Sequence, residues 1–138
     1  MDLATNYLGL RLAHPFMPGA SPLVDDLDNV KRLEDAGASA IVMHSLFEEQ
    51  ISREQVASFM HAERCGESFS EALAFFPNPK SFALGPEEYL AQLSRIKGTV
   101  RVPVIASLNG TTAGGWLQYA RAIEGAGADA LELNVYAV

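Results

Sequence analysis

Residues 34–41, Glu-Asp-Ala-Gly-Ala-Ser-Ala-Ile, and residues 124–131, Glu-Gly-Ala-Gly-Ala-Asp-Ala-Leu, repeat one pattern. Each copy predicts the end of a helix, a turn of small residues with glycine at the cap, and then a strand. Residues 40–43 and 102–108 are almost wholly apolar, as in strands that are buried on both faces. The repeated order of helix, short turn and buried strand predicts a parallel α/β sheet with right-handed crossovers.

Further elements extend this β-α order along the chain. Apolar residues at helical spacing predict helices over 27–37, 86–97 and 113–126, and strands are predicted at 15–19, 40–43, 102–108 and 130–135. Residues 5–13 predict a short hairpin or entry strand, and residues 46–80 predict a helical stretch followed by a long loop. The resulting fold class is α/β, with four parallel strands, intervening helices and a short hairpin in front. A small doubly wound sandwich is the alternative.

Composition restricts the function classes. The 138 residues predict one domain, and 10 basic against 17 acidic residues give a net charge of −7, which argues against nucleic acid or an anionic membrane as partner. The single Cys65 excludes an internal disulfide framework, and His61 with Cys65 is too small a set for a metal site. No run approaches the roughly 18 apolar residues of a membrane helix, and no signal peptide is evident, so we expect a soluble, cytoplasmic protein.

Small residues, most of them polar, lie at or just after the carboxyl end of each predicted strand, where ligands bind in α/β sheets and barrels. The candidates, in strand order, are Gly19, Ala20 and Ser21; His44 and Ser45; Ser107, Asn109 and Gly110; and Asn134 with Tyr136. Most have a structural alternative, because His44 could be a satisfied core histidine and Ser45 a helix cap. Asn134 is harder to explain structurally, since a buried amide needs a partner. As a set, these groups suit the edge of a flat, uncharged heterocycle.

Four segments carry a resemblance to a known family. They are residues 7–23 (YLGLRLAHPFMPGASPL), 32–51 (RLEDAGASAIVMHSLFEEQI), 102–110 (VPVIASLNG) and 127–136 (GADALELNVY). The sequence resembles the dihydroorotate dehydrogenase family of FMN-containing (β/α)8 barrels, and most closely its dihydroorotate dehydrogenase-like branch. The resemblance implies that residues 1–138 form the N-terminal half of a TIM barrel. It also implies FMN-dependent CH–CH oxidation of a small, dihydropyrimidine-like substrate, as in pyrimidine biosynthesis.

The resemblance assigns roles residue by residue. It implies flavin contacts at Ala20 and Ser21 after the first strand, and at His44 and Ser45, where the family has a Lys-Ser pair. Side chains below the flavin ring would be Ser107 and Asn109. The family's Glu-Leu-Asn motif matches residues 132–134, so Asn134 would bond flavin or substrate.

Two departures from the family concern the substrate. The position of the family's catalytic Cys or Ser holds Ala137, preceded by Tyr136, whose phenol with an ordinary pKa of about 10 is a poor base at neutral pH. Ala83 replaces a substrate-binding Asn. No catalytic residue is therefore assigned, and dihydroorotate itself is in doubt as the substrate.

The length of the chain bears on whether the barrel is complete. A complete barrel takes about 250 residues, so we expect a truncated half-barrel that binds FMN weakly or not at all alone. Its partner would be a missing C-terminal half-barrel or a second copy in a homodimer. One alternative function is a non-catalytic half-barrel that dimerises or binds a protein partner. Another is a different barrel enzyme, such as an isomerase or aldolase.

Overall fold

The computed structural model describes residues 1–47, 85–110 and 113–135. Their elements are β1 (Thr5–Tyr7), β2 (Leu10–Leu12), the 3-10 helix η1 (Pro22–Asp25), α1 (Leu27–Asp35), β3 (Ile41–Phe47), α3 (Pro86–Thr99), β4 (Val104–Asn109), α4 (Ala113–Gly125) and β5 (Ala130–Asn134). The last three strands form a parallel sheet in the order β3-β4-β5. The predicted α/β class, the hairpin and the three predicted helices are confirmed. Most of the predicted region 46–80, with His61 and Cys65, lies outside the described residues, as does Ala83.

The prediction of four parallel strands is wrong for the described residues, which contain three. Residues 15–19 do not form a strand. Pro15 and Pro18 have no N–H to give to a ladder. The segment still lies beside the start of β3, because the Phe16 carbonyl accepts hydrogen bonds from the backbone N–H and the hydroxyl of Ser39 (3.1 and 2.8 Å).

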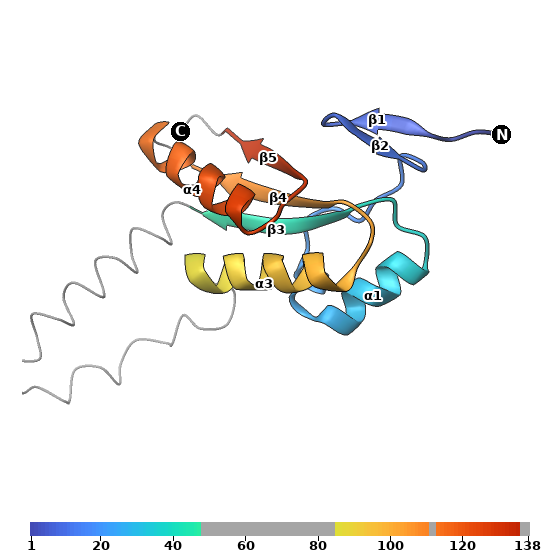
Figure 1. Cartoon of the computed structure of the whole chain (residues 1–138), viewed down its shortest axis with the longest axis horizontal. Coiled ribbons are helices and arrows are strands. Elements are labelled where there is room, and N and C mark those ends of the chain that lie inside the picture. The colour runs from blue at the N-terminus through green and yellow to red at the C-terminus, as the bar shows by residue number, and fades with distance from the viewer. Residues whose placement is uncertain (48–84, 111–112, 136–138) are drawn as a thin grey trace, which may run out of the picture.

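The β1–β2 hairpin turns through Leu8 and Gly9, which both have positive φ (50° and 78°). Positive φ at both central residues is the geometry of a type I′ turn, which matches the twist of the flanking strands. The hairpin lies on one side of the parallel sheet, and α1 and α3 lie on the other (Figure 1).

The two faces of the sheet bury different side chains. Ile41, Met43 and Val104 belong to a large apolar cluster with residues of α1, α3 and α4. The alternate residues Val42 and Ile105 pack with Leu12 of the hairpin in a second, smaller cluster. The first face is therefore the helix face. The second is the hairpin face, covered by the hairpin at the amino ends of its strands.

The two sequence copies end their helices in the same way. Gly37 and Gly127 have φ of 93° and 97°. In each copy the glycine N–H donates to the carbonyl three residues back, and the next N–H donates to the carbonyl five residues back (2.8 and 3.0 Å at Gly37, 3.0 and 3.3 Å at Gly127). This pair of bonds is the Schellman motif, which needs a left-handed residue at the glycine position.

Gly37→Ala is expected to lower the free energy of unfolding by about 1–2 kcal/mol, because an L side chain disfavours this φ. Steric crowding would contribute little, since a Cβ at Gly37 meets no described atom within 4 Å. Denaturant unfolding measures the change. The matched control is Gly98→Ala in the last turn of α3, where a Cβ is equally unhindered and φ is not positive. Helix propensity predicts a gain of up to about 1 kcal/mol there, and equal losses at both glycines would contradict the explanation.

None of the helices in the described ranges is long and apolar enough to span a membrane.

Candidate functional site

A β-bulge in β3 sets up the site. Val42 pairs with Ile105 and Ser45 with Ser107, so β3 has one more residue than β4 between these pairs. The extra residue shifts the alternation of side chains along β3. Leu46 and Leu108, the next pair, are buried in the cluster of the helix face. Ser45 and Ser107 therefore project together to the hairpin face.

Three side chains meet on this face near the carboxyl ends of the three strands. Ser45 Oγ lies 2.8 Å from Ser107 Oγ, and the Asn134 amide nitrogen donates to both hydroxyls at 3.0 Å. Ser107 is fully buried, and the other two residues are partly buried. We call Ser45, Ser107 and Asn134 the polar cluster. All three were predicted as cofactor-binding residues, and the structure brings them together.

A count of the hydrogens shows which hydrogen-bond donors and acceptors of the polar cluster are not used within it. Its three contacts need three hydrogens, and the two hydroxyls supply only two, so the amide must present its NH₂ group to the serines. The NH₂ group then supplies two hydrogens and one hydroxyl supplies the third. One hydroxyl hydrogen is left over, and the Asn134 carbonyl oxygen accepts no hydrogen bond from the described residues. The polar cluster thus offers one uncommitted donor and one uncommitted acceptor.

Asn109 and Glu132 lie next to the polar cluster in the sheet register. Asn109 pairs with Asn134, and Glu132 pairs with Ser107. Since paired residues of neighbouring strands project to the same side, both side chains belong to the hairpin face. Asn109 is partly buried, and its side chain makes no hydrogen bond to the described residues.

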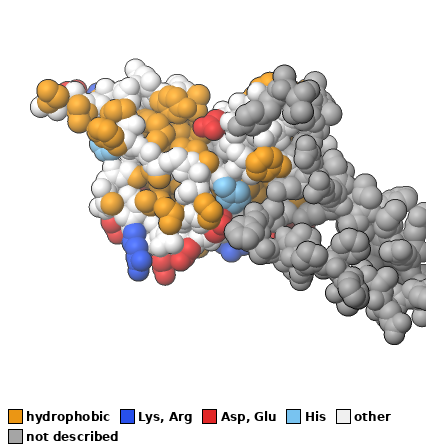
Figure 2. Space-filling view, turned by 180° about the vertical axis from the view of Figure 1, so that it is seen from behind, with side chains coloured by type: hydrophobic (Ala, Val, Ile, Leu, Met, Phe, Trp, Pro, Cys, Tyr) orange, Lys and Arg blue, Asp and Glu red, His pale blue; other side chains and the backbone are white. Residues whose placement is uncertain are grey.

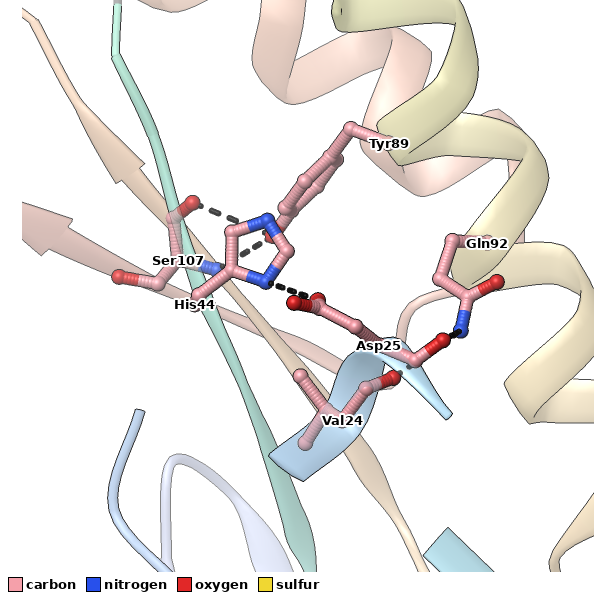
Figure 3. Close-up of polar contacts among 6 residues, drawn as sticks. All are labelled: Val24, Asp25, His44, Tyr89, Gln92 and Ser107. Carbon is pink, nitrogen blue, oxygen red and sulfur yellow. Dashed lines mark hydrogen bonds and ion pairs between the residues drawn. The ribbon is translucent and has the colours of Figure 1, made fainter. Parts of the chain in front are cut away.

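His44 does not join the polar cluster, although it precedes Ser45. Its ring packs edge-on against Tyr89 of α3, with ring centroids 5.5 Å apart and an interplanar angle of 84°. Nδ1 lies 3.1 Å from Asp25 Oδ1 but is buried without a hydrogen bond of good geometry in the described residues. The contact is therefore an ion pair only when the imidazole is protonated. Figure 3 shows His44 between Tyr89 and Asp25, with the Ser107 side chain pointing away from them.

Tyr89 reaches the sheet from α3. The Ser107 N–H donates to Tyr89 Oη (3.0 Å), and the Tyr89 hydroxyl donates to the Ser107 carbonyl (3.2 Å). Burial raises the pKa of Tyr89 to about 12, and the hydrogen bond with the Ser107 backbone opposes this rise. In the sequence, Tyr89 is one of the apolar residues at helical spacing that predict the helix over 86–97, and nothing there indicates a contact with Ser107.

Gln92 is a second buried residue that the sequence did not single out. Its amide nitrogen donates to the carbonyls of Val24 and Asp25, both at 3.0 Å (Figure 3). These bonds attach α3 to η1, which carries the Asp25 carboxylate beside His44. The sequence did hold a signal for this role: Gln92 is a polar residue three positions after Tyr89, on the buried face of the predicted helix, and a buried amide needs partners.

Ala20 and Ser21, predicted after the first strand, make no hydrogen bond to the polar cluster in the described part of the chain. Ala20 is exposed, and Ser21 begins η1 without a side-chain cap bond. No hydrogen bond among the described residues links either of them to the three strand ends. Tyr136 and Ala137 lie outside the described residues.

Comparison of the chain with models of protein families gives no match, and a search of curated proteins also finds none.

Proposed function

We propose that this chain forms part of a flavin-binding β/α barrel and serves an FMN-dependent oxidoreduction of the dihydroorotate dehydrogenase type. The observation that supports the proposal is the polar cluster, whose three contacting side chains have one donor and one acceptor to spare. It lies near the carboxyl ends of three neighbouring parallel strands, where barrel enzymes bind their ligands.

The donor set of the cluster fits the flavin. The pyrimidine edge of an isoalloxazine carries an N–H beside carbonyl oxygens, so it needs one acceptor and one donor. The Asn134 carbonyl and the spare serine hydroxyl are groups of these kinds. Both groups are neutral, as suits an uncharged heterocycle. Ser107 is fully buried, so a ligand that left its polar groups without hydrogen-bond partners would lose binding free energy.

The layers of the molecule suit a segment of a barrel. Helices pack on one face of the sheet, and the hairpin covers the amino ends of the strands on the other. In the proposed half-barrel, residues 15–19 occupy the place of the first strand, beside the amino end of β3. The two hydrogen bonds from Ser39 to the Phe16 carbonyl support this placement.

In the proposed reaction, a dihydropyrimidine-like ring loses one hydrogen from each carbon of a CH–CH bond. We propose that this reaction takes place in the cytoplasm. FMN, when bound, would accept one of these hydrogens with both electrons, as hydride, and the other would leave as a proton to water or to a base outside this chain. The residues of this chain would bind and orient the flavin. Asn134 and a serine hydroxyl would hold the ring edge. The β1–β2 hairpin and the apolar cluster that it forms with Val42 and Ile105 would shield the amino ends of the strands from water. The proposal assigns no proton-transferring residue to this chain.

A fluorescence-quenching titration tests the proposal. Of weak and absent binding, the free donor and acceptor of the polar cluster favour weak binding, so FMN is expected to bind with a Kd of about 0.1 to 1 mM, equivalent to roughly −5.5 to −4 kcal/mol. A flavin methylated at N3 cannot donate to the Asn134 carbonyl, so we expect it to bind about tenfold more weakly. Equal affinity for the two flavins would contradict recognition of the ring edge. Sub-micromolar FMN binding would contradict the half-barrel.

A second candidate function is association without catalysis. Figure 2 shows hydrophobic side chains gathered on the face seen from behind. The exposed large apolar residues include Leu3, Tyr7, Leu8, Phe16 and Leu23. In addition, β3 and β5 each pair with only one strand in the described sheet, and open edges favour association. Size-exclusion chromatography with light scattering separates the candidates, because a stable dimer that does not bind flavin would favour this one.

A further inference from the structure

The bulge in β3 interrupts the ladder beside Ser107. Met43 and His44 stand opposite the single residue Ala106, immediately before Ser45 pairs with Ser107. Buried backbone groups need partners, and a bulge takes some of them away. Here the Tyr89 hydroxyl bonds both the N–H and the carbonyl of Ser107. A side chain from a helix thus supplies a partner to both backbone groups of Ser107 beside the bulge.

We propose that Tyr89 is a positioning residue for the polar cluster: it acts through the backbone of Ser107 to hold the Ser107 hydroxyl against Ser45 and Asn134. For flavin binding, this inference rests on the proposed function. Tyr89 contacts the cluster through Ser107 and, in the described residues, makes no hydrogen bond to Ser45 or Asn134. Its effect on a ligand is therefore indirect.

The distances make the cluster sensitive to small movements of Ser107. Its hydroxyl has contacts of 2.8 and 3.0 Å, and a displacement of about half an ångström would take both outside good hydrogen-bond range. Tyr89 itself is held firmly, since it is fully buried and packs against the His44 ring. A fixed hydroxyl on a fixed ring therefore determines where the Ser107 backbone lies.

Tyr89→Phe tests the inference in the full 138-residue chain. The direct readout is the Asn134 side-chain NH₂ signal in an ¹⁵N-correlated NMR spectrum, recorded without ligand. We expect this signal to shift and the Ser107 amide to exchange faster with solvent. The matched control is Gln92→Leu, which removes two buried hydrogen bonds of the same helix but none to Ser107. It should leave the Asn134 signal in place.

An unchanged Asn134 signal in Tyr89→Phe, or an equal shift in both variants, would overturn the inference. If Tyr89→Phe does not fold, a measurement on the wild-type chain tests the inference instead. A nuclear Overhauser contact between the Tyr89 ring and the Ser107 amide supports the contact, and its absence overturns it.

FMN titration separates this inference from the proposed function. If wild type binds, Tyr89→Phe should raise the Kd about tenfold, equivalent to 1.4 kcal/mol, and an unchanged Kd would count against positioning. If wild type does not bind FMN but the Asn134 signal moves in Tyr89→Phe, the proposed function fails and the positioning role stands.

Discussion

Asn134→Leu is expected to weaken FMN binding by about 10- to 100-fold, because it removes the proposed ligand acceptor and leaves buried polar groups unmatched. Leucine has nearly the shape of asparagine, so the strand and its packing should be kept. The substitution also removes both hydrogen bonds from the amide to the serine hydroxyls. Fluorescence or NMR titration over millimolar FMN measures the loss.

Asn109→Ala is the matched control for this prediction. Asn109 pairs with Asn134 across β4 and β5 and ends its strand on the same face, but its side chain makes no hydrogen bond to the described residues. The account expects a smaller loss of affinity than for Asn134→Leu. If the two variants lose affinity equally, or if only Asn109→Ala does, the polar cluster is not the binding site.

The free energy of unfolding is expected to fall by about 2–3 kcal/mol between pH 10 and pH 12 through Tyr89 alone. Burial raises the pKa of Tyr89 to about 12 in the folded chain, whereas an unfolded tyrosine titrates near about 10. In this range the unfolded chain loses the phenol proton and the folded chain keeps it. The stabilising contribution is therefore complete below pH 10 and lost as the pH rises through 12.

Denaturant unfolding at a series of alkaline pH values measures this loss. Tyr89→Phe has no phenol at this position, so the difference between wild type and variant isolates the contribution of Tyr89. The expected difference shrinks steadily from pH 10 to pH 12. A difference that stays constant over this range would show that Tyr89 ionises as readily in the folded as in the unfolded chain, contrary to its burial.

Much of the fold was predictable because local signals agree with the tertiary structure. Gly37 and Gly127 mark the helix ends and adopt the left-handed conformation there. The apolar runs at 40–43 and 102–108 lie in strands that are buried on both faces. The predicted strand at 15–19 failed because Pro15 and Pro18 have no N–H to give to a ladder.

The site was predictable only in part. Ser45, Ser107 and Asn134 were identified because they lie at the carboxyl ends of predicted strands, where ligands bind in α/β proteins. The bulge could not be predicted. A strand that is buried on both faces has no alternation of polar and apolar residues, so an extra residue leaves no mark in the sequence pattern. For the same reason His44 was grouped with Ser45, although the bulge directs it toward Tyr89. The role of Tyr89 depends on a contact between distant segments, which helical spacing cannot predict.

The most direct test of the flavin site is an NMR titration of the ¹⁵N-labelled chain with FMN up to about 1 mM, a range suited to a weak complex. We expect the largest shifts on the Asn134 side-chain amide and on the backbone amides of Ser45 and Ser107. Shifts that are absent, or that centre on the helix face around Asp25 and His44, would contradict it.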